Sequence, residues 1–361
     1  MLKEWSTQDY REGDENAIAE LFNIVFNKPL SLARWRWQYR DNHAGLITIA
    51  LAKGKNDQLA GQYAVRPVRM KFGNKIRLGT LSLDTMTHPE YRGQGIFVKL
   101  ASYLYSDLSN RGIPVTYGFP NKASYLGFIK GLQWVDLSSP FPLYIRPLKF
   151  SRVVAARVHN KAAASLLGRW ASVGYHLISG RRRPTLPAGY RLMSADSFDE
   201  RIDILWEKTS DLAPIMVIRD RQYLNWRYHE NPTETYAIFL AERSDAIHGY
   251  IVLKKVDRFG LRVGFIVDLL AVQDIPQISL GLVGSAVDYF TDAGMDIVGC
   301  LMFPHAYYAK ALRANGFFRA RERMFPQDIH LGVRSNTSEF PVNYVSDPTH
   351  WYITFGDHDA I

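Results

Sequence analysis

The chain of 361 residues repeats one order of sequence features twice, and this repetition limits what it can fold into. Each copy has a Trp-Arg helix signal, a tyrosine, an Asp/Glu-Asn turn, an apolar β-run, a polar turn and a second β-run opened by glycine. The copies are LARWRWQYRDNHAGLITIALAKGKNDQLAGQYAV at 32–65 and QYLNWRYHENPTETYAIFLAERSDAIHGYIVL at 222–253. Two copies at such a long spacing favour duplicated domains over a solenoid.

The parallel extends further along both copies. Residues 81–90 match residues 265–274, which aligns Asp84 with Asp268, and residues 115–134 match residues 298–317. The coarse order β-α-α-β-β-β-α-β-α-β predicts an α/β (α+β) fold of two tandem domains, each a mixed, mostly antiparallel sheet flanked by helices. We expect domains at 1–148 and 188–361, joined by a basic helical connection at 149–187.

Within the first copy, the periodicity and turn signals predict individual elements. Helices are expected at 16–26, 32–40, 95–109 and 122–131, and β-strands at 47–53, 58–71, 76–88 and 115–119.

Composition excludes several classes of protein. The chain is 47% hydrophobic, enough for substantial cores, and its one cysteine, Cys300, lies in an apolar run that predicts a core strand. A disulfide framework is therefore impossible, and no Cys/His cluster indicates a metal site. The polar N-terminus and the absence of a run of about 18 apolar residues predict a cytoplasmic protein without a membrane span.

The net charge of +9 is concentrated in one stretch. Residues 137–195 contain ten Lys and Arg and no acidic residue, and the rest of the chain has 34 basic against 35 acidic residues. Apolar residues near helical spacing at 154–177 predict either a helix that bridges the two domains or an interfacial helix, over 151–183, on an anionic membrane. No stacking-aromatic array or DNA-reading motif accompanies the charge, so we expect no nucleic-acid partner.

The stretch YRGQGIF, residues 91–97, contains two glycines at the junction between a β-run and a predicted helix. Unpaired amides and the helix dipole favour an anion at such a turn, and glycine lets the backbone approach a phosphate closely. The spacing fits neither the dinucleotide motif GxGxxG nor the GK[ST] of a P-loop.

The order of β-meander, RGQG turn, helix, apolar strand and N-x-x-x-Y helix resembles the GNAT (Gcn5-related) N-acetyltransferase superfamily. Residues 92–97 resemble its pyrophosphate loop, and residues 121–134 resemble its last helix and the aromatic residue that follows. With the internal repeat, the resemblance covers nearly the whole chain as tandem GNAT domains of a bacterial type. This chain departs from the pattern at Phe97, at Gln133 and at Phe128, which stands near the family's helix tyrosine.

The resemblance implies an acyl-CoA-dependent N- or O-acyltransferase, with acetyl-CoA or another acyl-CoA as co-substrate and a small-molecule or glycan acceptor. It implies Asp84 as general base and Tyr125 as general acid. The expected CoA contacts are Met86, Thr87, His88, Arg92, Gly93, Gln94, Gly95, Ile96, Phe97 and Asn121. The acceptor's identity and the oligomeric state stay open.

Each of these roles has a structural alternative. Asp84 is alternatively a buried carboxylate that bonds a neighbouring strand, as Asp268 would in the second copy, and Tyr125, like its counterpart Tyr308, is alternatively an aromatic core residue. His88 precedes a proline and is expected to shape the turn, and Asn121 is a good helix N-cap. The repeated Trp35, Trp37 and Trp226 either line an acceptor cleft or pack in the core. His350, Asp357, His358 and Asp359 are expected in an exposed polar terminus.

The second copy lacks the glycine turn. It has Asp274 and Pro276 where the diphosphate would lie, which adds a negative charge and removes an amide donor, so we expect it to shape the acceptor cleft without binding CoA. Two other functions stay open: a non-catalytic acyl-CoA or glycan-binding protein, and an aminoacyl-tRNA-dependent transferase of related fold. The glycine turn disfavours the second, because such an enzyme needs no CoA site.

Overall fold

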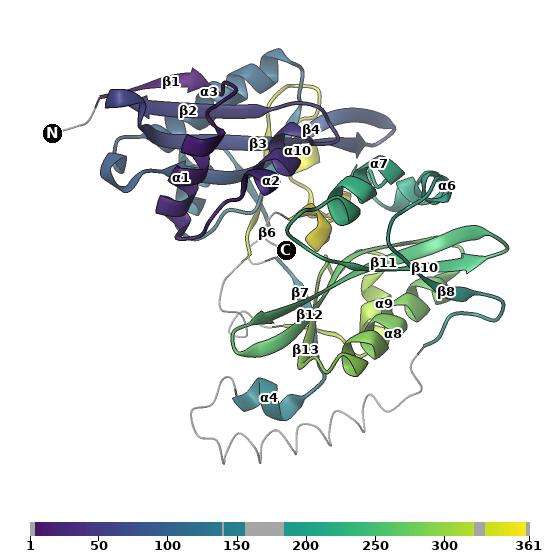
Figure 1. The fold of residues 1–361 in the computed structure, drawn as a ribbon. Coiled ribbons are helices and arrows are strands. Elements are labelled where there is room, and N and C mark those ends of the chain that lie inside the picture. The colour runs from purple at the N-terminus through teal and green to yellow at the C-terminus, as the bar shows by residue number, and fades with distance from the viewer. Residues whose placement is uncertain (1–3, 139–140, 156–183, 321–328, 359–361) are drawn as a thin grey trace.

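The structure, a computed structural model, describes residues 4–138, 141–155, 184–320 and 329–358. It contains two mixed sheets, each flanked by helices, which lie one beside the other (Figure 1). The predicted α/β fold in two halves is confirmed. Most of the expected basic connection lies outside the described residues.

The first sheet follows the order β1-β2-β3-β4-β5-β15-β6, with β9 paired beside β3. Every pair is antiparallel except β4 with β5. The strands are β1 (Trp5–Asp9), β2 (Thr48–Gly54), β3 (Leu59–Phe72), β4 (Lys75–Thr87), β5 (Val115–Gly118), β6 (Val135–Ser138), β9 (Ile215–Val217) and β15 (Leu331–Ser335).

The helices of the first half cover both faces of this sheet. They are α1 (Glu15–Phe26), α2 (Leu32–Trp35), the π-helix η1 (Arg36–Arg40), α3 (Ile96–Asn110) and the π-helix η4 (Gly127–Gly131), with short 3-10 turns η2 (Lys55–Asp57) and η3 (Pro89–Tyr91). These bounds confirm the four helices predicted for the first copy, although the last begins later than expected.

Strand alternation assigns these helices to opposite faces of the first sheet. Tyr63 and Val65 of β3 belong to the core cluster that holds the apolar side of α3. Ala64 between them belongs to the other cluster, which contains Leu21 of α1 and Trp35 of α2. The helices α1 and α2 therefore cover one face, and α3 covers the other.

The second sheet has the order β14-β7-β13-β12-β11-β10-β8, with β12 and β13 as its parallel pair. Its strands are β7 (Leu143–Pro147), β8 (Arg191–Ala195), β10 (Ala237–Arg243), β11 (Ala246–Arg258), β12 (Leu261–Ala271), β13 (Ile297–Leu301) and β14 (Phe318–Arg319). The accompanying helices are α4 (Phe150–Ala155), α6 (Arg201–Thr209), η5 (Ser210–Leu212), α7 (Arg221–Leu224), the π-helix η6 (Asn225–His229), α8 (Pro276–Asp292), α9 (Ala309–Ala314) and η9 (Phe355–Asp357). The short helix α10 (Val342–Val345) packs against β15 of the first sheet and is followed by η8 (Pro348–His350) (Figure 1).

The two halves exchange strands. β7 precedes residue 148 but pairs with β13 of the second sheet, for example Ile145 with Gly299. β15 comes from the end of the chain but lies between β5 and β6 of the first sheet, with Gly332 opposite Gly118. Each half therefore completes its sheet with a strand from the other.

The two copies also meet through equivalent residues. Trp37 of η1 stacks on Trp226 of η6, with ring centroids 4.9 Å apart and an interplanar angle of 13°. Each indole N–H donates to the other residue's carbonyl, at 2.7 Å from Trp37 and 3.0 Å from Trp226. Trp35 is fully buried. All three tryptophans therefore pack in the core, and Trp37 also lines the cavity described below, so both expectations apply to it. The reciprocal contacts of Trp37 and Trp226 join the repeated helices.

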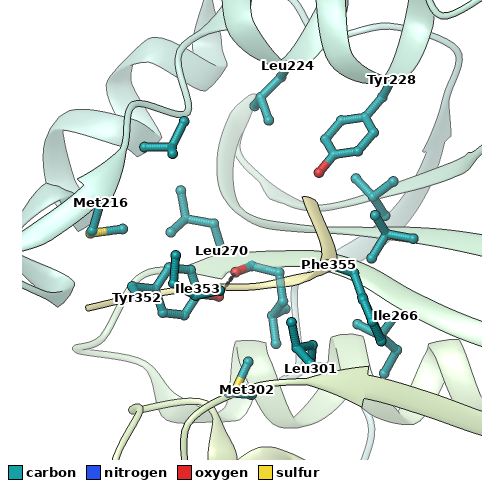
Figure 2. Packing of buried hydrophobic residues seen from close by; sticks show 14 of the residues in the cluster. Met216, Leu224, Tyr228, Ile266, Leu270, Leu301, Met302, Tyr352, Ile353 and Phe355 are labelled. Carbon is teal, nitrogen blue, oxygen red and sulfur yellow. Dashed lines mark hydrogen bonds between the residues drawn. The ribbon is translucent and has the colours of Figure 1, made fainter. Parts of the chain in front are cut away.

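The C-terminal segment, residues 351–358, is part of the core. Figure 2 shows Tyr352, Ile353 and Phe355 among the buried side chains of both halves, with Met216 and Leu301 nearby. The expectation of an exposed terminus is therefore wrong for Asp357, which is 1% exposed, and for His358, which is 9% exposed. Local polarity suggested solvent, but tertiary partners far along the chain bury these residues.

Candidate active site

The parallel strands β4 and β5 separate at the centre of the first sheet. Their pairing covers only Thr80 with Thr116, Leu81 with Tyr117 and Ser82 with Gly118, although β4 continues to Thr87. The amide of His88 donates to Ala60 on the β3 side at 2.9 Å. Because consecutive amides of a strand alternate in direction, the amide of Thr87 faces the opposite edge, into the gap.

A β-bulge on β4 presents Asp84 beside this gap. Asp84 has a φ of 46°, and the register with β3 shifts between Gln62 and Ala64. The carboxylate oxygen Oδ2 accepts hydrogen bonds from Gln38 Nε2 at 2.6 Å and from the Tyr39 hydroxyl at 2.7 Å. Burial, followed by the charge of Asp84, raises the pKa of Tyr39 well above its usual value. Tyr39 is therefore a hydrogen-bond donor to the carboxylate.

A cavity of about 420 Å³ runs through the gap between the two faces of the sheet. Phe22 and Arg34 line it on the α1–α2 face, and Phe128 and Trp134 line it on the α3 face. Asp84 lies in its wall. The second half also contributes lining side chains, namely Arg227, Asn231, Thr233, Glu234, Tyr236, Arg258 and His358. Side chains from both faces of the first sheet and from the second half therefore line one cavity.

The glycine turn precedes α3 on one face of the sheet. Gly93 and Gly95 have φ values of 77° and 73°, which only glycine adopts without strain, and both are exposed. A Cβ atom added at either would meet no atom within 4 Å. In the described chain, the amides of Gly93, Gln94 and Gly95 have no backbone acceptor. The turn therefore offers open, unpaired donors at a helix N-terminus.

Phe97 follows the turn but is directed away from it. Its ring meets Phe128 of η4 edge-on, with centroids 4.9 Å apart. A side chain at Gly127 would collide with Phe97, because an added Cβ would lie 2.4 Å from its ring. The aromatic residue thus packs α3 against the last helix, where it does not obstruct the turn.

Three other expected contact residues have local structural partners. The Asn121 carbonyl Oδ1 accepts from the amides of Ala123 at 3.0 Å and Ser124 at 3.1 Å, as expected of a cap, and Asn121 also lines the cavity. His88 is buried and accepts from the amide of Glu90 at 3.3 Å, so it shapes the turn as predicted. Met86 is buried on β4.

Tyr125 lies apart from the cavity. Its hydroxyl donates to Asp136 and its ring lies 4.5 Å from that of His330. The neighbouring Ser124 and Phe128 line the cavity instead. The structure therefore brings Asp84 and Asn121 together at the cavity and leaves the acid role expected for Tyr125 without geometric support. The one-residue offset between Tyr125 and Ser124 rotates the hydroxyl to another side of the helix.

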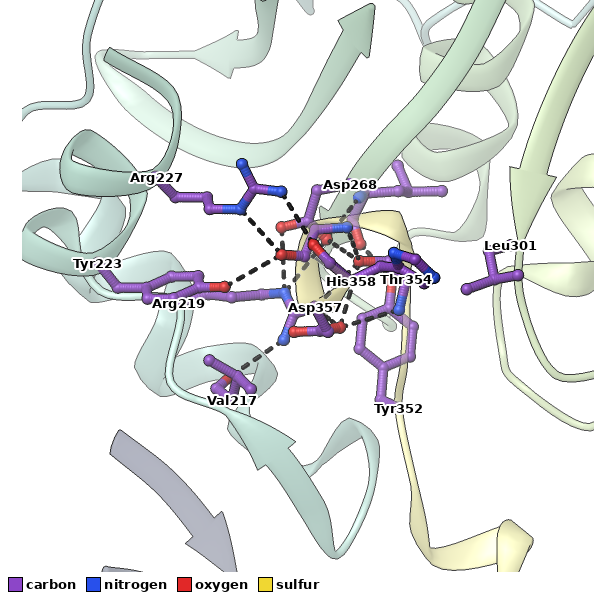
Figure 3. A network of polar contacts seen from close by, with 12 residues as sticks. Val217, Arg219, Tyr223, Arg227, Asp268, Leu301, Tyr352, Thr354, Asp357 and His358 are labelled. Carbon is purple, nitrogen blue, oxygen red and sulfur yellow. Dashed lines mark hydrogen bonds and ion pairs between the residues drawn. The ribbon is translucent and has the colours of Figure 1, made fainter. Parts of the chain in front are cut away.

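In the second copy, the counterpart of Asp84 belongs to a buried ion network. Arg219 donates to Asp268 at 3.2 Å and to Asp357 at 2.8 Å, and all three side chains are nearly inaccessible (Figure 3). Burial opposes the charge of Arg219, but the two carboxylates outweigh burial and raise its pKa well above the usual value. Tyr228 donates to Asp268 at 3.2 Å, as Tyr39 does to Asp84. Asp268 is thus a structural residue.

Tyrosines fill the gap of the second sheet. The pairing of β12 with β13 ends at Ile266, and β12 continues to Ala271, the counterpart of Thr87. The Tyr308 hydroxyl bonds both the amide of Ala271, at 2.8 Å, and its carbonyl, while the Tyr352 hydroxyl bonds the carbonyl of Leu269. At Thr87, no described side chain makes an equivalent bond. The strand edge is therefore occupied in the second half.

The described parts of the chain contain neither a metal-binding cluster nor an accessible thiol. There, no group of three or more His, Cys, Asp or Glu side chains is arranged to hold a metal ion. Cys300 is buried in β13, and burial raises the pKa of its thiol far above the usual value. Among the described helices, none is long and apolar enough to cross a membrane.

Comparison with known proteins agrees with this geometry. Residues 6–129 match the family model of the acetyltransferase (GNAT) domain. The whole chain resembles the crystal structure of a GCN5-related N-acetyltransferase from Anabaena variabilis, at a TM-score of 0.63 and 13% identity, covering 92% of this chain and 73% of that one. A probable N-acyltransferase from Enterococcus faecalis gives a TM-score of 0.62 and 10% identity, with the same coverages of 92% and 73%.

The Saccharomyces cerevisiae N-myristoyltransferase with bound myristoyl-CoA has a TM-score of 0.59 and 11% identity, over 98% of this chain and 89% of that one. At these identities the structural likeness concerns the fold. The sequence matches no curated protein at a significant level.

Proposed function

Because residues 6–129 belong to the GNAT acetyltransferase superfamily and the whole chain has a tandem GNAT-like fold, we propose that this protein is an acyl-CoA-dependent N-acyltransferase. It transfers an acyl group, acetyl in the simplest case, to the amine of a small-molecule or glycan acceptor. The observation that carries the proposal is the open gap between β4 and β5, with unpaired amides beside it and Asp84 in the cavity that crosses it.

The binding roles follow from the donors on the α3 face. The amides from Gly93 to Phe97 hold the diphosphate of CoA, and the exposed Arg92 adds a positive charge. The edge of β4 from Met86 to His88 bonds the pantetheine arm. The amide of Thr87, which faces the gap, is aimed at the negative charge that develops on the thioester oxygen.

Asp84 removes a proton from the acceptor's ammonium, and the free amine then attacks the thioester carbonyl. A C–N bond forms while the C–S bond breaks. The attacking nitrogen loses its extra proton, and the CoA sulfur gains a proton and leaves as a thiol. We assign Ser124, which lines the cavity, the hydrogen bond to the leaving sulfur in place of Tyr125. Acyl-CoA supplies the activated acyl group, and the protein supplies position, proton transfer and charge stabilisation.

The second half completes the acceptor side of the cavity and binds no CoA of its own. Tyr308 and Tyr352 occupy its strand edge, and Asp274 and Pro276 replace the glycine turn. These contacts support the expectation that the second copy frames the acceptor.

Two substitutions at one position test the CoA site. Asn and Asp both tolerate a positive φ, and the space above Gly93 is open, so Gly93→Asn and Gly93→Asp should fold equally well. Only Gly93→Asp places a negative charge against the diphosphate. We expect its dissociation constant for CoA, measured by calorimetry, to exceed that of Gly93→Asn by about tenfold or more.

The intact protein should also release thiol from acetyl-CoA when amines are added. Equal CoA affinities of the two variants would mean that the diphosphate of CoA does not bind at this turn. Absence of any CoA binding by the intact protein would overturn the enzyme assignment as a whole.

A further inference from the structure

The cavity carries more positive than negative side chains, and their distribution is asymmetric. Lys28, Arg34, Arg66, Arg227 and Arg258 line it, whereas its carboxylates are Asp84 and Glu234. Glu234 is paired with Lys254 at 2.8 Å. The carboxylate that lies at the gap between β4 and β5 is that of Asp84.

Three of these cations lie toward solvent and come from three separate segments. Lys28 follows α1, Arg34 is in α2, and Arg258 ends β11 of the second half, at the tip of its hairpin with β12. Lys28 and Arg258 are exposed and Arg34 is half-buried. None of the three has a carboxylate within 4 Å in the described chain. We call Lys28, Arg34 and Arg258 the cationic rim.

The cationic rim lies on the wrong side of the sheet to serve the CoA diphosphate. The glycine turn opens at the N-terminus of α3, and α3 packs on the face of the sheet opposite to α1 and α2. Residues 92–97 do not line the cavity, whereas Lys28 and Arg34 do. The charge of the rim is therefore available to the acceptor.

We propose that the acceptor is an amine that also carries a carboxylate or phosphate group. This inference rests on the proposed transfer reaction and names its substrate class. The ammonium lies beside Asp84, and the anionic group points outward to the cationic rim. Each charge of the acceptor therefore meets a side chain of opposite charge. Neutral amines lose the second attraction, and polyamines are repelled by the rim.

Matched pairs of amines test the inference with acetyl-CoA as donor. Glucosamine 6-phosphate is compared with glucosamine, and β-alanine with ethylamine, by thiol release. We expect kcat/KM to be higher by about tenfold or more for the anionic member of a pair, because its anionic group adds ion contacts with more than one cation of the rim. The advantage should shrink as salt is added.

The double variant Arg34→Gln with Arg258→Gln should reduce this advantage to about twofold or less, since two of the three cations of the rim are removed. The KM for acetyl-CoA should stay unchanged. A control with Lys208→Gln and Lys310→Gln removes two exposed charges on α6 and α9, outside the cavity lining, and should leave both quantities unchanged.

A wild-type preference for neutral or cationic amines would overturn the inference, as would a double variant that changes only the KM for acetyl-CoA. If no probe is acetylated, the same pairs are titrated by calorimetry into the CoA-saturated protein. Equal or undetectable binding of both members then overturns the acceptor class. If acetyl-CoA itself does not bind, the proposed function is wrong, and this result differs from a failure of the acceptor class alone.

Discussion

Asp84 receives two hydrogen bonds on a single carboxylate oxygen, from Gln38 and Tyr39 of the same π-helix. Donors to the charged form of a carboxylate favour its ionisation. They also fix its orientation, because η1 is anchored by the Trp37–Trp226 stack. In the proposed mechanism, Tyr39 is therefore a positioning residue whose effect on the reaction passes through Asp84.

Replacing Tyr39 with Phe removes one donor from the ionised carboxylate. The acid limb of the kcat/KM profile should move upward by about one pH unit, since the loss disfavours the charged base. Activity well above that limb should be largely retained, whereas Asp84→Asn should lose about a hundredfold or more at every pH.

Tyr228→Phe is the internal control, because it breaks the equivalent contact to Asp268 in the second half. It should reduce the free energy of unfolding without moving the pH profile. If Tyr39→Phe lowers kcat/KM by the same factor at all pH values, Tyr39 contributes packing and does not act through the ionisation of Asp84.

Asp84 could be singled out from the sequence, because a carboxylate in an apolar run is visible without tertiary information, and it lies in the cavity wall. The same holds for the glycine turn, whose local chemistry decides its conformation. Tyr125 was assigned on its type and approximate spacing, but a helix turns by about 100° per residue. A one-residue difference in register therefore put Ser124 into the cavity and Tyr125 against Asp136.

At the scale of elements, the π-helices η1 and η6 and the loops after them form one contact between the copies. His43, just after η1, lies against Trp226 with ring centroids 4.9 Å apart and meets Tyr223 edge-on at 5.1 Å. Burial, and then the charges of Arg66 and Arg69, lower the pKa of His43 to about 3. The contact is therefore built around a neutral imidazole.

This contact predicts a specific loss of stability in acid. Between pH 6.5 and pH 3 the unfolded chain binds a proton at His43 and the folded chain does not, so stability falls as pH falls through that window. His43→Phe keeps the ring and removes the titration. From pH 7.5 to pH 5, the wild type should lose about 2 kcal/mol more than this variant in urea unfolding.

Other titrating groups are common to both proteins and cancel in this difference. Equal losses in the two proteins would mean that His43 becomes protonated in the folded state at pH 5, and that the contact opens to water there.

The predicted elements and their order were confirmed because each depends on local periodicity. The C-terminal segment was misjudged for a physical reason: Asp357 and His358 are polar in a polar context, and their burial depends on Arg219 and Arg227, more than 125 residues upstream. The strand exchange was invisible for the same reason, since β7 and β15 are ordinary short β-runs whose partners are set only by the assembled sheets.

At the scale of the whole molecule, the exchange of β7 and β15 makes each half depend on the other. We propose that the two duplicated copies meet near residue 148 of the sequence. Because strands are exchanged across it, this position does not separate two units that fold independently. β15 lies between β5 and β6, so its removal would leave one edge of β5 unpaired, on the strand that ends at Gly118 beside the cavity.

Separating the chain after residue 148 tests this dependence. Fragment 1–148 alone lacks β9 and β15 and exposes β7, whose Tyr144 and Ile145 are buried in the intact chain. Unpaired apolar edges promote aggregation, so we expect this fragment to be insoluble or to bind no CoA when expressed by itself. Co-expressed with fragment 149–361, it should form a stoichiometric complex that binds CoA, because the exchanged strands can pair across the cut. A monomeric fragment 1–148 that unfolds cooperatively and binds CoA as tightly as the intact chain would show instead that the first half folds without the exchange.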